Sequence, residues 1–259
     1  MRRLSSVLFV VLAACPHPAP PASDRGAGPA VSAPPDRALA EKERLAAVDA
    51  ADAGDAEAQL AHLDASLKAA PAYTPSELDL AEALLFRGVE LDRAAAALDT
   101  AFPRESANAR LWRLRGNLAE QRGAPPAAAA AAYERAVELD PADRATRRRL
   151  AQKLLADGKA AAAVAELETL KAQAPEDRDC RLALAEGYEK AGRLALAEDE
   201  LSQLAALDAK NPFYHRRLAD LFDRQGDRKQ ADAERAKAAA LAGQQSGARK
   251  LRPLLPSKK

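Results

Sequence analysis

The sequence predicts an all-α protein, and three observations carry that prediction. Alanine, the strongest helix former, accounts for about a quarter of the 259 residues, whereas aromatic residues make up 4%. No stretch of four to eight residues alternates apolar and polar side chains in the manner of a half-buried strand. Glycines recur at a nearly constant spacing, which is typical of a chain built from repeats. A sheet-containing domain is therefore not expected.

The charge balance argues against one class of partner. The chain has 39 basic and 38 acidic residues, which leaves a formal net charge of +1. A protein that binds nucleic acid usually carries a basic face or stripe, because phosphates dominate the affinity. We therefore expect no nucleic-acid partner.

Residues 1–14 are predicted to be a cleaved signal peptide. Arg2 and Arg3 precede an apolar run that extends from Leu4 to Ala14. A membrane-spanning helix needs about 20 apolar residues, so this run is too short to span and fits an export signal.

The end of this segment, Leu12-Ala13-Ala14-Cys15, resembles the bacterial lipobox. The resemblance implies cleavage before Cys15, a diacylglycerol on its thiol and acylation of the new amine. Two or three acyl chains would hold the protein at a membrane. Pro16, in place of the aspartate that retains lipoproteins in the inner membrane, favours the outer membrane. The alternative is an incidental cysteine in an ordinary signal peptide.

Residues 15–39 are predicted to be a lipidated cysteine followed by a disordered tether. The segment is rich in Pro, Ala, Gly and Ser and has no pattern of core residues. Such a composition separates the folded part from the membrane without forming a core of its own.

Residues 40–243 are predicted to be a series of about six repeats. Six glycines are separated by 34, 35, 35, 34 and 34 residues: Gly54, Gly88, Gly123, Gly158, Gly192 and Gly226. The clearest units, 144–177, 178–211 and 212–243, share a Leu-Ala pair, a large residue three positions later and an alanine five positions after the glycine. In that order these residues are Leu150-Ala151, Leu154 and Ala163; Leu184-Ala185, Tyr188 and Ala197; and Leu218-Ala219, Phe222 and Ala231.

This pattern resembles the tetratricopeptide repeat. The resemblance implies helix-turn-helix units that stack into a right-handed superhelical solenoid. The glycine would end the first helix in a left-handed conformation, the alanine would allow close approach of the second helix, and Pro71, Pro141 and Pro175 would separate the units.

The repeats differ in how closely they follow the family pattern. Residues 109–243 are clear, and the unit that begins at Ala109 has the family's Trp112 and Gly116 in its first helix and Tyr133 in its second. It departs from the pattern at Arg115, where a leucine is expected, and at Pro125-Pro126, which adds a residue to the turn. Residues 40–108 keep the period but have lost most signature residues.

We expect no catalysis, cofactor or metal site. His17, His62 and His215 lie in the tether and in two different repeats, and none stands near Cys or carboxylates at a metal-ligand spacing. With Cys15 acylated, Cys180 is left without a disulfide partner, and its position on an apolar helix face predicts a buried free thiol.

The expected partner is a protein or peptide in the concave groove lined by the first helices. The residues that should point inward are Arg110, Arg113, Asn117, Glu120, Arg148, Arg149, Gln152, Arg216 and Asp220. Arg113, Asn117 and Arg148 resemble part of the carboxylate clamp with which some tetratricopeptide domains hold an acidic C-terminus. The fifth repeat offers Asp179, Leu182 and Ala183 where further cations would be needed. The alternative is that these arginines pair with neighbouring acids for solubility.

Residues 244–259 are predicted to be a basic disordered tail, which could instead dock its leucines on a partner or contact an anionic surface. In architecture the chain resembles the pilotin lipoproteins of the type IV pilus system, which implies a scaffold that helps to assemble or stabilise an envelope complex. The alternatives are a lipoprotein partner of outer-membrane β-barrel assembly, a periplasmic adaptor for cell-wall enzymes, or an enzyme hidden in degenerate repeats. No oligomeric state is predicted.

Overall fold

The computed structural model describes residues 34–250. The predicted signal peptide 1–14, the lipobox with Cys15, most of the tether and residues 251–259 lie outside the described residues, and those predictions stay predictions. From Pro35 onward the chain forms a single unit.

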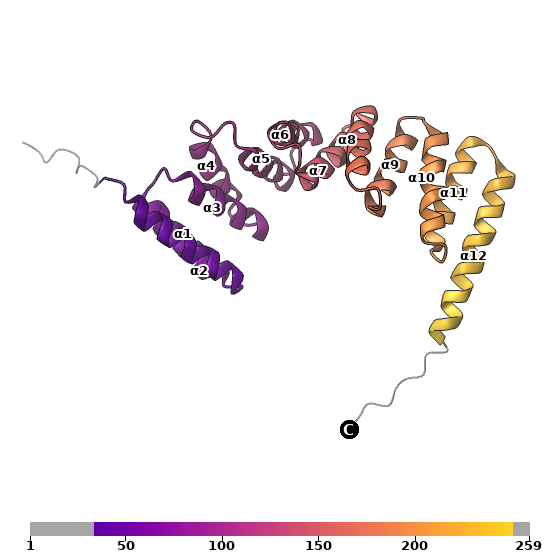
Figure 1. The fold of residues 1–259 in the computed structure, drawn as a ribbon, viewed down its shortest axis with the longest axis horizontal. Coiled ribbons are helices and arrows are strands. Elements are labelled where there is room, and N and C mark those ends of the chain that lie inside the picture. The colour runs from indigo at the N-terminus through magenta and orange to yellow at the C-terminus, as the bar shows by residue number, and fades with distance from the viewer. Residues whose placement is uncertain (1–33, 251–259) are drawn as a thin grey trace, which may run out of the picture. The chain divides into compact units, whose positions relative to one another are not determined.

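The described residues form helices and no strand. The helices are α1 (Arg37–Asp52), α2 (Ala56–Ala69), α3 (Thr74–Arg87), α4 (Leu91–Ala101), α5 (Ala109–Gln121), α6 (Pro126–Leu139), α7 (Arg144–Ala156), α8 (Ala160–Gln173), α9 (Arg178–Lys190), α10 (Leu194–Leu207), α11 (Pro212–Gln225) and α12 (Arg228–Lys250). Each odd-numbered helix packs against the following even-numbered one, and neighbouring pairs lie side by side in chain order (Figure 1). The prediction of an all-α solenoid of six helical pairs is confirmed.

The six periodic glycines lie in the turns inside the helical pairs, as predicted. Their φ angles range from 67° to 83°, which is the left-handed region. At Gly88, for example, the backbone N–H donates to the last carbonyls of α3, and a Cβ added there would meet nothing within 4 Å. The requirement for glycine at this turn is therefore conformational and not steric.

Two of these turns are one residue longer than the others, which explains the two spacings of 35. In the turn before α6 the added residue is accommodated by Pro125, with Pro126 in the first turn of the helix. In the turn before α4 it is accommodated by Glu90, the one non-glycine residue with positive φ (48°) among those described.

The signature residues of the three clearest repeats form the core, as predicted. The Leu-Ala pairs, the large residues after them and the alanines of the second helices are all buried. In the unit before them, Gly116 is buried against the fully buried Tyr133. Arg115 does not enter the core, because its guanidinium lies over the Phe102 ring, 4.3 Å from its centroid, while Leu114 is fully buried beside it.

The buried apolar side chains fall into two clusters. One extends from Ala47 to Leu114, and the other from Ala129 to Ala231. The boundary lies between α5 and α6, where a glycine and a run of alanines supply little side-chain volume. Cys180 belongs to the second cluster and is a buried free thiol, as predicted, with its pKa raised by burial.

The last helix is longer than the sequence predicts. The tail was expected to begin at residue 244, but α12 continues to Lys250. Residues 244–250 read QQSGARK: five of the seven favour helix, Ser246 and Gly247 do not, and no proline occurs before Pro253. The helix therefore extends seven residues into the segment assigned to the tail.

Candidate functional site

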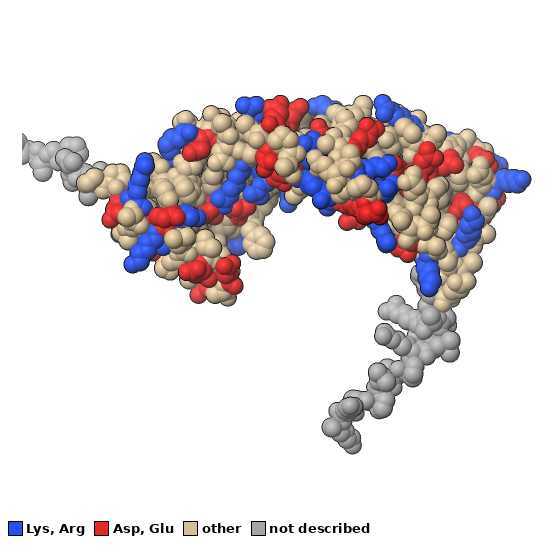
Figure 2. Space-filling view, in the orientation of Figure 1, with Lys and Arg blue, Asp and Glu red and all other residues tan. Residues whose placement is uncertain are grey.

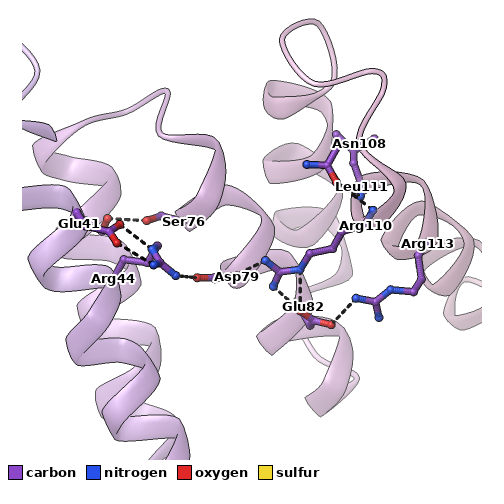
Figure 3. A network of polar contacts seen from close by, with 10 residues as sticks. Glu41, Arg44, Ser76, Asp79, Glu82, Asn108, Arg110, Leu111 and Arg113 are labelled. Atoms are coloured by element: carbon purple, nitrogen blue, oxygen red, sulfur yellow. Dashed lines mark hydrogen bonds and ion pairs between the residues drawn. The ribbon is translucent and has the colours of Figure 1, made fainter. Parts of the chain in front are cut away.

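Five charged side chains on α1, α3 and α5 form an ion-pair ladder across the first three helical pairs (Figure 3). The ladder consists of Arg44, Asp79, Glu82, Arg110 and Arg113. The Asp79 carboxylate joins two helices, because it lies 3.1 Å from Arg44 Nη1 and 2.7 Å from Arg110 Nη1. Glu82 accepts from Arg110 Nε at 3.0 Å and from Arg113 Nη2 at 3.0 Å. The two acids of α3 are thus held between the cations of α1 and α5.

The arginines of the ladder favour the ionised form of Glu82. Burial alone would raise the pKa of Glu82, but its contacts with Arg110 and Arg113 outweigh burial and leave the pKa lowered. At the α1 end, Glu41 accepts from both Arg44 Nε and Nη2 at 2.8 Å and from the Tyr73 hydroxyl. These contacts, Arg44 first, lower the pKa of Glu41 to about 2.

A pocket of about 500 Å³ lies between α1, the start of α2 and α3. We call it the first pocket. Its lining residues are Ala47, Val48, Ala51, Gly54, Ala56, Gln59, Leu63, Asp79, Glu82, Ala83, Phe86, Arg87 and Arg110. Most of this lining is apolar, and the Phe86 side chain at its edge is 92% exposed. A phenylalanine left in water at the edge of an apolar pocket is a typical anchor point for another molecule.

A second pocket of about 370 Å³ lies between α3, α5 and α7. Phe86 and Glu82 line both pockets, and the second is otherwise more polar, with Arg113, Asn117 and Glu120 in its wall. The Tyr133 hydroxyl donates to Asn117 Oδ1 at 2.8 Å and to Glu120 Oε1 at 2.6 Å. Asn117 and Glu120 are therefore already engaged by a core tyrosine.

Most of the predicted inward-facing cations have a carboxylate partner within the chain. Arg110 and Arg113 lie together on α5 and share Glu82. Arg148 on α7 pairs with Asp177, the residue that caps the N-terminus of α9, and Arg149 lies 3.7 Å from Glu120. An acidic peptide terminus would have to compete with Glu82 or Asp177 for these guanidinium groups.

The remaining predicted residues lie apart from both pockets. Gln152 on α7 and Arg216 and Asp220 on α11 are exposed, and no side-chain hydrogen bond or ion pair engages them within residues 34–244. The clamp is therefore only partly assembled: Arg113 and Asn117 line one pocket, but Arg148 does not.

Neither Phe86 nor the first pocket is predicted from the sequence. The signal for Phe86 lies in Leu84-Leu85-Phe86, three consecutive apolar residues at the end of a helix, of which only the first two are buried. Because the first two repeats have few signature residues, the pattern assigned no inward-facing position to them.

Two further features of residues 34–250 bear on chemistry. No helix among them is both long and apolar enough to span a bilayer. No group of three or more His, Cys, Asp and Glu side chains that could hold a metal ion occurs within this described part.

No protein-family model matches the sequence, and no curated protein matches it. Solved structures do resemble the fold. A tetratricopeptide repeat protein from Parabacteroides merdae aligns with a TM-score of 0.61 at 17% identity and covers 82% of this chain and 88% of its own. YrrB, described as a tetratricopeptide repeat protein with an unusual peptide-binding site, gives 0.57 at 18% identity and covers 64% of this chain and 85% of its own.

The fold is that of a tetratricopeptide repeat protein. PilF of Pseudomonas aeruginosa shares it as well, with a TM-score of 0.57 at 18% identity over 76% of this chain and 89% of PilF. The tetratricopeptide repeat fold predicted from the glycine period is confirmed, and it extends through the first two pairs, which the sequence pattern identified only weakly.

Proposed function

We propose that this chain is a membrane-anchored scaffold that binds a protein partner on the face presented by its first helices. The observation that carries the proposal is the pair of adjoining pockets with Phe86 between them. An apolar pocket flanked by fixed charges provides both affinity and orientation for a polypeptide. The shared fold with YrrB, whose description includes a peptide-binding site, supports the same role.

The anchoring part of the proposal rests on the sequence alone. Leu12-Ala13-Ala14-Cys15 follows a short apolar run, and Pro16 favours the outer membrane. Lipidation at Cys15 would place the solenoid in the periplasm behind the tether, where it would help to assemble or stabilise an envelope complex, as pilotin lipoproteins of the type IV pilus system do. A role in β-barrel assembly or as an adaptor for cell-wall enzymes is the alternative.

The anchoring is tested by replacing the proposed lipid acceptor. We expect the wild-type chain to partition into the detergent phase and Cys15→Ser to move to the aqueous phase. Cys180→Ser is the matched control and should partition like the wild type. Detergent-phase partition of Cys15→Ser would contradict lipidation at this residue.

The binding face is tested by capture of partners with the lipidated protein. We expect Phe86→Ser to reduce capture with an unchanged melting temperature, because this side chain is 92% exposed. Phe213→Ser, on α11 and away from both pockets, should capture partners normally. Recovered pilus, barrel-assembly or cell-wall components would separate the three envelope roles, and undiminished capture by Phe86→Ser would exclude this face as the binding surface.

The predicted binding role of Arg113 and Arg148 is tested separately. If Arg113 and Arg148 bind an acidic partner, Arg113→Glu and Arg148→Glu should weaken capture without lowering thermal stability. The same change at Arg135, an exposed residue of α6 that lines neither pocket, should have little effect on either measurement. A parallel loss of capture and stability would show that these arginines act through Glu82 and Asp177 and hold the solenoid together.

A further inference from the structure

The turn between α1 and α2 concentrates negative charge beside the first pocket. No Lys or Arg occurs from Leu45 to Leu67. Asp49, Asp52 and Asp55 are exposed, and no cation pairs with them among the described side chains. Figure 2 shows acidic side chains gathered at the lower left of the molecule, where the α1–α2 pair ends. Unpaired exposed acids favour a cationic partner.

The acidic turn and the apolar pocket are continuous. Ala51, Gly54 and Ala56 belong to the turn or its immediate flanks and also line the first pocket. Val48, on the α1 wall of the pocket, is 42% exposed, and Phe86, on α3, is 92% exposed. The surface therefore combines an apolar floor for an aliphatic side chain with exposed acids at the α1–α2 turn for neighbouring cations. The two arginines that line the pocket, Arg87 and Arg110, are paired with carboxylates of the chain.

Residues 249–259 have the complementary chemistry. This segment reads RKLRPLLPSKK and contains five cations, three leucines and no acid. Five cations without an acid give the segment a strong positive charge, opposite in sign to the turn between α1 and α2. Its first two residues, Arg249 and Lys250, end α12, a 23-residue helix whose principal packing partner is the 14-residue α11.

We propose that residues 249–259 of a second copy dock on the first pocket, with leucines against Phe86 and Val48 and cations beside Asp49 and Asp52. A second copy is the source because α12 packs on α11 in the last pair, whereas the pocket is lined by residues of the first two pairs and by Arg110 of the third. The proposal rests on the proposed function only in treating this pocket as a polypeptide-binding surface.

Such a contact would join different surfaces on the two copies. A heterologous contact of this kind does not close on itself unless its rotation completes a ring, so it produces open chains. The mean length of these chains should rise with protein concentration. It should fall with added salt, because exposed charges are screened within about 10 Å at 0.1 M ionic strength.

The first experiment measures the docking itself. A fluorescently labelled peptide of residues 249–259 is titrated with a chain that ends at Ala248, so that no internal copy of the segment competes. We expect Phe86→Ser and the double change Asp49→Asn with Asp52→Asn each to weaken binding by about tenfold or more, as loss of a central anchor or of complementary charge does. The controls Leu196→Ser and Asp199→Asn change an exposed leucine and an exposed acid on α10, away from the first pocket, and should bind normally.

The leucines of the segment are tested from the other side. A peptide with Leu251, Leu254 and Leu255 changed to serine keeps every cation and should lose binding. The proposal would be overturned if the serine peptide bound as tightly as the original peptide. It would also be overturned if the Phe86 and aspartate variants bound the original peptide as tightly as the unchanged chain does.

The second experiment identifies the source of the segment. Sedimentation velocity of the unlipidated Cys15→Ser chain should show a mass that rises with concentration, and removal of residues 249–259 should abolish the rise. If the full chain stays monomeric at all concentrations and does not bind the added peptide, the segment docks within its own copy. That result would overturn the second-copy proposal. Partner capture that persists without residues 249–259 would leave the proposed function intact, so the two proposals fail separately.

Discussion

Gly116 and Gly88 show that two glycines of one fold can be required for different physical reasons. At Gly116, inside α5, an added Cβ would lie 2.3 Å from Tyr133 Cε1, so the tyrosine ring occupies the space. At Gly88 the surroundings are open, and the constraint is a φ of 67°. The first glycine keeps two helices close together, and the second ends a helix.

We expect Gly116→Ala to lower the free energy of unfolding by about 1–3 kcal/mol through overpacking. Gly88→Ala should lower it by about 1–2 kcal/mol through the left-handed backbone. Urea denaturation followed by circular dichroism measures both. Combining Gly116→Ala with Tyr133→Leu should recover part of the lost free energy of unfolding, whereas combining Gly88→Ala with Tyr133→Leu should recover none. Additive effects of the changes at Gly116 and Tyr133 would contradict the steric explanation.

Tyr188 links stability to alkaline pH. Burial, followed by its hydrogen bond to Glu168 at 2.8 Å, raises the pKa of its hydroxyl from 10 to about 12. Between these values the folded state binds more protons than the unfolded state, so the free energy of unfolding must fall as pH rises. We expect Tyr188→Phe to reduce this fall in denaturation curves recorded from pH 9 to 12; an unchanged pH dependence would exclude Tyr188 as its source.

At the scale of elements, α3 is the central connection of the first three pairs. Asp79 on α3 is 16% exposed and contacts arginines of both α1 and α5. By contrast, the fully exposed Asp92 at the start of α4 contacts Arg122. Both are acid–arginine pairs between neighbouring repeats, but they differ in burial and in the number of cations they join.

We expect Asp79→Asn to lower the free energy of unfolding by about 1.5–3 kcal/mol, because two half-buried arginines lose a charged acceptor. Asp92→Asn should change it by less than about 1 kcal/mol, as is usual for surface ion pairs. Chemical denaturation of both variants and of the unchanged chain measures the two losses in free energy of unfolding. Similar small effects would show that Asp79 does not stabilise the stack.

The helices and turns could be predicted from the sequence, but the side-chain contacts between helices could not. The glycine period located every turn within a pair, and the Leu-Ala pairs located the core, because both depend on local backbone geometry and helix periodicity. The pairing of Arg110 with Asp79 and Glu82 depends on the distance between helices 28 or more residues apart. Helix periodicity does not give that distance, so the sequence left open whether the arginines bind a partner or pair with neighbouring acids, and it did not identify Asp79 and Glu82 as those acids. Phe86 was missed for a related reason, since its exposure depends on where α1 and α5 leave space.

The solenoid as a whole has two apolar clusters, one in each half. We therefore expect a core substitution in one cluster to lower the stability of its own half more than that of the other half. In a solenoid each repeat is stabilised by its neighbours, so a local loss need not spread evenly. Trp112, the single tryptophan, packs against the first cluster and reports on that half.

We expect Leu63→Ala, in the first cluster, to lower the denaturant midpoint seen by Trp112 fluorescence more than that seen by circular dichroism. Leu204→Ala, in the second cluster, should do the reverse. Both side chains are fully buried, so each change should cost about 2–5 kcal/mol. Coincident midpoints from both probes in both variants would mean that the clusters unfold as one unit.

The glycine turns of the last three pairs, in each of which the second helix begins two residues after the glycine, have a consequence for how such a chain can change length. Because residues 144–177 begin and end at equivalent points of the period, inserting a second copy after residue 177 would add a complete helical pair. Each junction in the longer chain would repeat a junction that already exists, apart from the one between the two copies. Growth by whole-unit duplication is thus compatible with the packing, whereas insertion of half a unit would leave an unmatched helix.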